Sequence, residues 1–293
     1  MVNTFRIGDL IKLKKSCKPF IHKAFNIETP ALVSKSQIIS GALRLINGLK
    51  DVKSGDKVLI KPNINSDDIY PGTTRVEGLV ELIRLLKDKG VDVSVGDMSS
   101  AFWHDTRTCA DKAGILKACK EEDTPLLFFE DYEWDNVKLP NTSLTSCYLT
   151  SKLCDFDHLV NLCVLKTHRM ADFTLSMKNL MGCLHLRTRM KMHTSNLKTM
   201  IGEFQRLITP VINIVDGTKC FIDGGPDKGE LREPGLVFAS KDRIALDVTC
   251  IRALQDLGSQ SLKNVNPWMH PQIIAGIRSG IGIQKDERIK IIT

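Results

Sequence analysis

The strongest constraint on the fold is a strand–helix–strand pattern in residues 57–97. Residues 57–65 (KVLIKPNIN) begin as an apolar strand, and residues 75–90 (RVEGLVELIRLLKDKG) have the spacing of an amphipathic helix closed by a glycine. Residues 91–97 (VDVSVGD) then alternate as a second strand. Two strands joined by a helix over about 40 residues pair in parallel through a right-handed crossover. The pattern therefore predicts an α/β fold with a largely parallel sheet flanked by helices.

Further alternating segments extend this arrangement along the chain. The patterns predict strands at residues 124–134, 157–165, 209–217, 236–240 and 287–293. They predict helices at residues 32–55, 107–123, 172–184, 195–208, 242–258 and 266–282. We expect an N-terminal extension (1–36) and one α/β domain (37–293). A weak boundary near residues 120–150 would divide that domain into two lobes, about 37–145 and 146–293, with a crevice between them.

The charge balance limits the classes of partner. The chain of 293 residues carries 41 Lys and Arg against 34 Asp and Glu, a net charge of +7. The basic residues are dispersed, the densest cluster (187–193) is short, and aromatic residues make up only 6%. Nucleic-acid-binding proteins concentrate cations on one face and add aromatic platforms or recognition motifs. We therefore expect no nucleic-acid partner, and the mild basicity favours small anionic ligands.

The cysteines indicate a reducing compartment. There are 9, an odd number; no CxxC pair occurs and most lie within apolar runs, which is typical of reduced core thiols. An iron–sulfur cluster needs clustered cysteines, so no intrinsic cluster is expected. No apolar stretch approaches the roughly 18 residues of a membrane span, and the first residues lack the apolar core of a secretion signal. These observations predict a cytoplasmic protein without a membrane partner.

Charged and amide side chains follow the predicted strands where each strand ends. In a parallel sheet these ends lie on one edge, and ligands of open α/β sheets bind outside that edge. The edge would gather Lys61, Asn63, Asp97, Lys166, His168, Asp216 and Asp242. Polar turn residues follow strands for purely structural reasons too, so one such residue alone carries little weight. The recurrence of lysine, histidine and aspartate favours a site.

The stretch 159–183 (LVNLCVLKTHRMADFTLSMKNLMGC) holds the candidate catalytic residues, Lys166, His168 and Lys178. A desolvated lysine can act as a base or link covalently to a carbonyl, and a neutral histidine can carry protons or hold a metal. Lys178, with Asn179 beside it, would bind an oxyanion. The ordinary alternatives are a solvated lysine on a helix face and a histidine that caps the core.

Other candidates would bind the substrate. Lys61 and Asn63 follow the first strand of the pattern. The cationic segment 185–193, which includes Arg187 and His193, is expected to be a loop that closes over an anion.

The remaining candidates lie in loops and at strand ends. Gly224 and Gly225 could offer backbone N–H groups to an oxyanion, or form only a tight surface turn. Asp97 and Asp216 are the candidate ligands of a divalent metal. Residues 103–105 (WHD) would cover the pocket.

These segments together resemble the domain-of-unknown-function family 362, which occurs in bacteria and archaea and is often fused to ferredoxin-like modules. The matching segments, in order over about residues 50–255, are KVLIKPN, the helix that leads to VSVGD, NLCVLKTH, MKNLMGC, INIVDG with GGPDKG, and LVFASKDRIALDV. The resemblance implies an α/β fold with a shared polar site and no particular reaction. This chain lacks the cysteine-rich segment of many relatives, which argues against an iron–sulfur centre of its own.

The layout is also similar to that of lactate-racemase-type enzymes, which use a lysine-tethered nickel pincer nucleotide and histidines. The analogy lies at the level of the fold. It would make Lys166 or Lys178 the tether and His168 a metal ligand or base.

The sequence thus favours an enzyme that acts on a small anionic or carbonyl-containing metabolite by proton transfer, isomerisation or redox-linked chemistry. Lys166 and His168 would move protons or fix the substrate. The alternative is a non-catalytic module that holds an anionic ligand or docks a ferredoxin-like redox partner in the same crevice. A divalent metal is compatible with the carboxylates, and a homodimer is compatible with the sequence.

Overall fold

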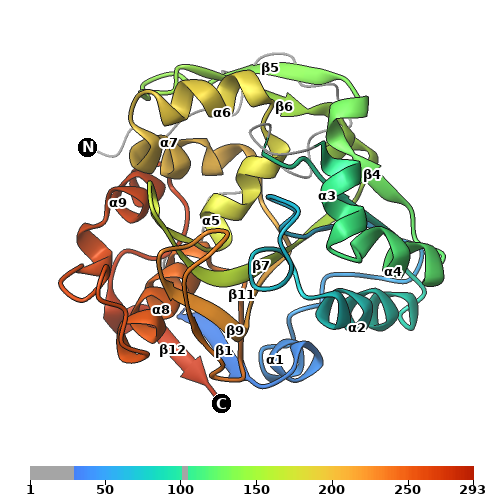
Figure 1. Ribbon diagram of the computed structural model, residues 1–293, viewed down its shortest axis with the longest axis horizontal. Coiled ribbons are helices and arrows are strands. Elements are labelled where there is room, and N and C mark those ends of the chain that lie inside the picture. Colours follow the sequence, from blue (N-terminus) through green and yellow to red (C-terminus); the bar gives the residue numbers. More distant parts are fainter. Residues whose placement is uncertain (1–29, 101–104) are drawn as a thin grey trace.

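A 10-stranded sheet forms the centre of the protein in the computed structural model, which describes residues 30–100 and 105–293 (Figure 1). Its strands are β1 (Ala31–Ser36), β2 (Lys57–Lys61), β3 (Asp92–Asp97), β4 (Leu126–Phe128), β7 (His158–His168), β8 (Asp172–Thr174), β9 (Ile212–Asp223), β10 (Glu230–Arg232), β11 (Leu236–Ser240) and β12 (Ile289–Ile292). The main path runs β12–β1–β11–β9–β7–β2–β3–β4. From β9 to β4 every pairing is parallel, whereas β11 runs antiparallel to both of its neighbours. The α/β fold with a largely parallel sheet is confirmed.

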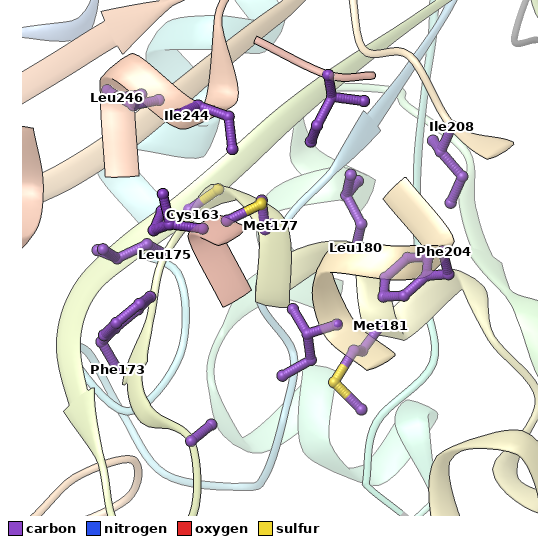
Figure 2. Packing of buried hydrophobic residues seen from close by; sticks show 14 of the residues in the cluster. Cys163, Phe173, Leu175, Met177, Leu180, Met181, Phe204, Ile208, Ile244 and Leu246 are labelled. Atoms are coloured by element: carbon purple, nitrogen blue, oxygen red, sulfur yellow. The ribbon is translucent and has the colours of Figure 1, made fainter. Parts of the chain in front are cut away.

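Helices cover both faces of this sheet (Figure 1). They are α1 (Ile39–Leu45), α2 (Val76–Lys87), α3 (Thr106–Lys112), α4 (Ile115–Glu121), α5 (Ser176–Asn179), α6 (Leu186–His193), α7 (Leu197–Glu203), α8 (Arg243–Asp256) and α9 (Pro271–Arg278). Successive strand residues point to opposite faces. Val58 and Ile60 of β2 therefore pack with α1 to α4, while Leu59 between them belongs to the cluster that includes α7, α8 and α9. Figure 2 shows part of this second cluster, with Met177 of α5 and Phe204.

A separate antiparallel ribbon holds β5 (Trp134–Lys138) and β6 (Ser146–Thr150). The strand predicted at 124–134 is therefore divided between two sheets, because a 3-10 turn at Phe129–Asp131 follows β4. A bridge between Leu149 and Leu184 joins this ribbon to the chain just before α6. The ribbon thus supports the helix that carries part of the site described below.

The prediction of one helix over residues 32–55 is wrong. The first residues of that range belong to β1, which pairs with β11 and β12, and α1 is a shorter helix that follows it. Buried Val33 next to exposed Leu32 shows the alternation of a strand rather than a helical stripe. Part of the stretch expected as an extension (1–36) is therefore built into the central sheet.

The length of β9 and the direction of β11 change two expectations about the polar edge. β9 continues beyond Gly217 to Asp223, so Asp216 lies inside a strand, in register with Val164 of β7. Asp242 does not join the other polar residues, because the antiparallel direction of β11 places it at the opposite edge. Its carboxylate instead accepts the N–H of Ala245 at 2.9 Å and caps α8.

Several helices differ from the predicted ones. The segment 172–184 is not one helix: β8 comes first, then α5, then a 3-10 turn at Leu180–Cys183. Residues 186–193, expected as a loop, form α6. The helix predicted at 107–123 is broken into α3 and α4 by Gly114, which has a φ of +77°. The helices predicted over 75–90 and 242–258 are confirmed as α2 and α8.

Most described cysteines are free and buried, namely Cys109, Cys119, Cys147, Cys163, Cys183, Cys220 and Cys250. Burial raises the pKa of the Cys147 and Cys183 thiols to about 12, so both stay protonated and unreactive at neutral pH. Cys154 departs from the expectation of reduced thiols because it is disulfide-bonded. Cys17, Trp103 and His104 lie outside the described residues. Within the described ranges, no helix combines the length and apolar character needed to cross a bilayer.

Candidate functional site

A cavity of about 460 Å³ lies at the carboxyl ends of β2, β3 and β7. This volume is typical of pockets for small molecules. The polar residues that line it are Lys61, Asn63, Asn65, Asp97, Ser100, Lys166, His168, Arg169, Thr174, Lys178, Asn179, Arg189, His193 and Asp227. The structure therefore brings together all three candidate catalytic residues with most of the candidate binding residues. Lysine, arginine and histidine outnumber the acids in this lining.

β7 extends beyond its predicted end and directs Lys166 and His168 to the same side. β8 folds back on it as an antiparallel hairpin, which pairs Lys166 with Thr174 and His168 with Asp172. Side chains two residues apart in a strand point to the same face. Thr167 between them points the other way and bonds toward β9. The hairpin thus presents both candidate residues to one cavity.

Lys166 is fully buried and has no carboxylate bonded to it. Its Nζ donates to the amide oxygen of Asn63 at 3.2 Å and to the backbone carbonyl of Gly72. Burial and, to a lesser extent, the charge of Lys178 lower the pKa of Lys166 to about 7, while Asp68 acts in the opposite direction. Lys166 is therefore close to half protonated at neutral pH.

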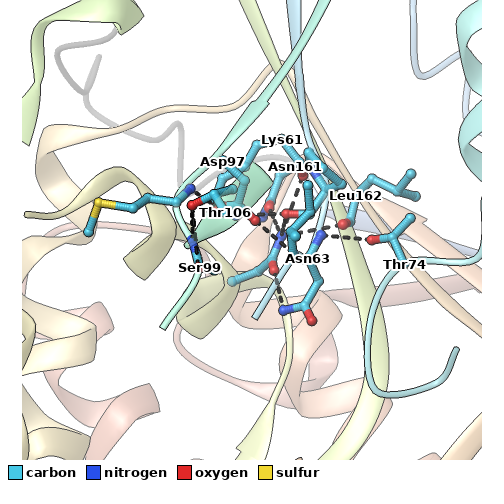
Figure 3. Close-up of polar contacts among 12 residues, drawn as sticks. Lys61, Asn63, Thr74, Asp97, Ser99, Thr106, Asn161 and Leu162 are labelled. Atoms are coloured by element: carbon cyan, nitrogen blue, oxygen red, sulfur yellow. Dashed lines mark hydrogen bonds and ion pairs between the residues drawn. The ribbon is translucent and has the colours of Figure 1, made fainter. Parts of the chain in front are cut away.

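A continuous chain of side-chain amides leads away from Lys166 through the buried interior. In order, it contains Lys166, Asn63, Asn179, Asn161, Asn213 and the backbone carbonyl of Ser240. Each asparagine accepts through its oxygen and donates through its Nδ2, so all of these amides point the same way (Figure 3 shows Asn63 and Asn161). Such chains polarise their members cooperatively. The chain orients Asn63 so that its oxygen, not its NH₂ group, faces Lys166.

Asn179 was predicted to bind an oxyanion, and the structure gives its amide other contacts. Its Nδ2 donates to Asn161 at 2.9 Å and to the carbonyls of Pro62 and Leu162 at 3.3 Å. Both hydrogens of the amide are therefore already used inside the protein. In this structure Asn179 positions Asn63 and, through it, Lys166.

Lys178 lies in the cavity without an acidic partner. Among the described residues its ammonium group makes no hydrogen bond or ion pair. Burial and, to a lesser extent, the charge of Arg189 lower its pKa to about 7. Its own charge in turn lowers the pKa values of Lys166, His168 and His193. Lys178 is thus surrounded by groups that are, or can become, positive.

The two histidines of the cavity use opposite ring nitrogens to bond the protein. His168 Nδ1 accepts the N–H groups of Met170 at 3.1 Å and Ala171 at 3.2 Å, so the neutral ring carries its proton on Nε2. His193 Nδ1 lies 2.7 Å from the carbonyl of Arg189, which can only accept, so this ring carries its proton on Nδ1. Burial is the main cause that lowers the pKa of both rings, so both are neutral at pH 7. His168 therefore offers a donor, and His193 an acceptor.

Arg189 lines the cavity and was not singled out from the sequence. Its guanidinium group donates to the carbonyls of Leu184 at 2.7 Å, Ser99 at 3.0 Å and Met98 at 3.0 Å, which ties α6 to the end of β3. Arg187, the predicted residue, is exposed on the same helix and does not line the cavity. Helical spacing could have revealed Arg189, because Arg189 and His193 are four residues apart and therefore share one face of a helix.

Lys61 and Asp97 neutralise each other at the base of the cavity. Their ion pair spans 2.7 Å, and both side chains are almost completely buried. The carboxylate of Asp97 also accepts the N–H groups of Ile64 and Met98, each at 2.8 Å. A Cβ atom at Gly182 would lie only 1.9 Å from this carboxylate, so the close packing requires glycine there.

The glycine-rich loop after β9 contributes other residues than those predicted. Gly224 and Gly225 do not line the cavity, and their carbonyls accept hydrogen bonds from the side chain and backbone of Arg169. Pro226 and Asp227 of the same loop do line it, and Asp227 forms a 3.0 Å ion pair with Arg169. The loop therefore closes one side of the cavity.

Asp97 and Asp216, the candidate metal ligands, are each held by a cation. Asp216 lies outside the cavity, where it pairs with Arg75 at 2.8 Å and accepts the hydroxyl of Tyr70 at 3.0 Å. Within the described ranges, no group of three or more His, Cys, Asp or Glu residues is arranged to hold a metal ion. His168 does not fit the role of a metal ligand either, because a metal on Nε2 would require a proton on Nδ1, which accepts two N–H groups.

Comparison with known proteins identifies the family. A family model described as "Domain of unknown function (DUF362)" matches residues 58–252. The chain belongs to the DUF362 family. Every residue of the cavity named above lies inside the matched range, so the site is built entirely by the DUF362 domain.

A curated protein is also similar to this DUF362 chain. A thylakoid-associated protein of Synechocystis sp. is 31% identical to it over 213 residues, which make up 70% of this chain and 64% of that protein. The chain thus spans less than two thirds of the length of this relative.

Proposed function

We propose that the protein is an enzyme that binds a small anionic metabolite in the cavity and transfers a proton to or from it. The environment of Lys178 carries this proposal, because this buried lysine faces Lys166, His168, Arg189 and His193 and has no bonded acid among the described residues. An uncompensated buried charge costs free energy, which an anionic ligand would offset. Buried groups with strongly shifted pKa values in a cavity are typical of functional sites.

Lys166 is the proposed base. A neutral lysine amine has two hydrogens, and the acceptors Asn63 and Gly72 take both of them. Its lone pair is then left for the ligand. With a pKa of about 7, Lys166 is sufficiently deprotonated at neutral pH to accept a proton and sufficiently basic to hold it.

The two histidines would serve the same reaction in complementary roles, His168 as a donor and His193 as an acceptor. The Nε2–H of His168 can donate to a carbonyl oxygen of the ligand and stabilise the negative charge that forms there when a neighbouring proton leaves. The unprotonated Nε2 of His193 can accept a hydrogen bond or a proton. This combination supports proton transfer beside a carbonyl group. A cytoplasmic setting is part of the same proposal and is supported by the free, buried cysteines, whereas the disulfide-bonded Cys154 does not fit it.

The test is solvent exchange in heavy water. The protein is incubated with a panel of small keto acids, hydroxy acids and phosphorylated metabolites, and incorporation of deuterium at carbon is followed by NMR. We expect exchange in at least one compound and a loss of about 100-fold or more in Lys166→Met, the order of magnitude for loss of a catalytic acid or base. The matched control is Lys120→Met, which removes an exposed lysine of α4 and should exchange at the rate of the unmodified protein.

Equal exchange rates in Lys166→Met and in the unmodified protein would refute the assignment of the base. Compounds that bind without any exchange would favour the non-catalytic alternative, in which the same cations hold a ligand or a partner's acidic group.

A further inference from the structure

Two of the five Lys and Arg side chains that line the cavity are already neutralised by acids, and this narrows where a ligand's anion can bind. Lys61 pairs with Asp97 at 2.7 Å, and Arg169 pairs with Asp227 at 3.0 Å. Each of these cations is therefore satisfied by an acid of the protein. Lys166 is satisfied by two neutral oxygens, from Asn63 and Gly72.

Lys178 and Arg189 differ from Lys61 and Arg169, because neither has a bonded acid among the described residues. Arg189 bonds three backbone carbonyls, which use three of its five N–H donors and do not neutralise its charge. Its pKa of about 10 keeps it positive at any physiological pH. Lys178 makes no bond to the described protein, and the charge of Arg189 lowers its pKa. Two neighbouring cations without a bonded acid are the arrangement that binds carboxylate and phosphate groups.

We propose that Lys178 and Arg189 together bind the oxyanion group of the ligand, and that Lys178 is protonated in the bound state. This inference rests on the proposed function and names the charge class of its ligand, a carboxylate or phosphate.

The distribution of charge explains why the proton goes to Lys178. The charge of Arg189 lowers the pKa of Lys178, which makes no hydrogen bond to the described protein, whereas Lys166 already donates to Asn63 and Gly72, so an anion beside Arg189 stabilises charge on Lys178 most. A proton on Lys178 in turn lowers the pKa of Lys166. The other charged or titratable side chains that line the cavity are Lys61, Asp97, His168, Arg169, His193 and Asp227, and Asp68 also acts on Lys166. Among these, Asp68 and Asp227 act on Lys166 rather than on Lys178.

Titration calorimetry with oxalate tests the proposal. Oxalate keeps both charges between pH 6 and 8, and repeating each titration in two buffers of different ionisation enthalpy gives the number of protons taken up. A lysine with a pKa of about 7 is roughly 90% deprotonated at pH 8 and 10% at pH 6. We therefore expect uptake of about 0.9 proton at pH 8 and about 0.1 at pH 6. The affinity should fall by roughly tenfold over the same interval, because only the protonated lysine binds.

Two variants separate the lysines. Lys178→Arg keeps a positive charge that cannot be lost, so it should bind oxalate at both pH values with no proton uptake and little pH dependence. Lys166→Met should keep the uptake of the unmodified protein. Circular dichroism and thermal unfolding of each variant confirm that it is folded. Sulfate, used in parallel, distinguishes a tetrahedral phosphate-like ligand from a planar carboxylate by which anion binds more tightly.

The possible failures are distinguishable. Oxalate binding without proton uptake would overturn this inference and leave the proposed function standing. Uptake that persists in Lys178→Arg but disappears in Lys166→Met would show that the proton goes to Lys166, and it would overturn this inference. If neither oxalate nor sulfate binds the unmodified protein at millimolar concentration, the inference and the proposed function both fail.

Discussion

The Nζ atom of Lys166 donates to the amide oxygen of Asn63 across 3.2 Å, and Asn63 donates in turn to Asn179 across 2.8 Å. This buried lysine is thus held by a polarised chain of neutral amides rather than by an acid. Lys61 on the neighbouring strand shows the contrast, since it pairs with Asp97 at 2.7 Å. A lysine bonded by neutral oxygens keeps a pKa of about 7, in the range where it can exchange protons.

The first prediction concerns Asn63. Asn63→Asp places a negative charge beside Lys166 and should raise its pKa by more than one unit, whereas Asn63→Leu removes an acceptor from the charged form and should lower it. NMR titration of isotope-labelled lysine side chains measures both shifts. Asn136→Asp, at an exposed position in β5, is the control and should leave the pKa of Lys166 unchanged. Shifts of the same sign in both Asn63 variants would contradict the bonding described here.

The second prediction concerns the buried ion pair. Lys61→Met leaves Asp97 buried without its counter-ion, so the free energy of unfolding should fall by about 3–5 kcal/mol. The matched control is Lys112→Met, which removes the partner of Asp67 at the surface and should cost about 0–1 kcal/mol. Denaturant unfolding measures both. The double variant Lys61→Met/Asp97→Asn should recover part of the loss, and a double variant less stable than Lys61→Met would rule out this explanation.

The third prediction concerns α6. Arg189→Lys cannot reproduce the fork that reaches the carbonyls of Leu184, Ser99 and Met98. It should reduce the free energy of unfolding by about 3–6 kcal/mol, since hydrogen bonds to charged groups contribute about 1.5–3 kcal/mol each and two of the three are lost. Arg187→Lys, on the exposed side of the same helix, should change it by less than about 0.5 kcal/mol. Similar effects of the two substitutions would mean that Arg189 does not anchor the helix.

The fourth prediction concerns pH. The pKa of Lys166 is about 7 in the folded protein and near 10.4 when unfolded, so between these values the unfolded chain binds more protons and stability rises with pH. Between pH 7 and 8.5 this rise amounts to about 1.5–2 kcal/mol for this lysine in the ligand-free protein. Lys166→Met removes this contribution, so the free energy of unfolding of the variant should rise less over that interval. Denaturant unfolding at each pH measures the difference. If the free energy of unfolding rises equally with pH in Lys166→Met and in the unmodified protein, the pKa of Lys166 is not lowered.

The sequence predicted the elements whose pattern is local. The helix α2 and the parallel strands around it follow from apolar spacing, and the polar residues after β2 and β7 do meet in one cavity. Lys166, His168 and Lys178 were found because charged residues interrupt apolar segments there, which is a local signal.

The rest depends on information that apolar patterning does not contain. An apolar strand looks the same in either direction, so the antiparallel β11 and the resulting position of Asp242 were not foreseen. Strand length depends on a partner, and β9 continues past Asp216 because β10 pairs with its second half. Arg189 was missed because α6 buries Thr188, Arg189 and Met192, a face that is mostly polar. A hydrophobic stripe, the usual helix signal, is therefore absent from that segment.

The central claim is that an anion binds between Lys178 and Arg189, and its most direct test is crystallographic. Crystals of the full chain are soaked in selenate, a tetrahedral dianion whose anomalous scattering locates it without bias. We expect a selenate peak inside the cavity, within hydrogen-bond distance of Lys178 Nζ and on the side of Arg189, and no such peak in Lys178→Met crystals. Selenate bound only at the protein surface, or bound equally in both crystals, would contradict it.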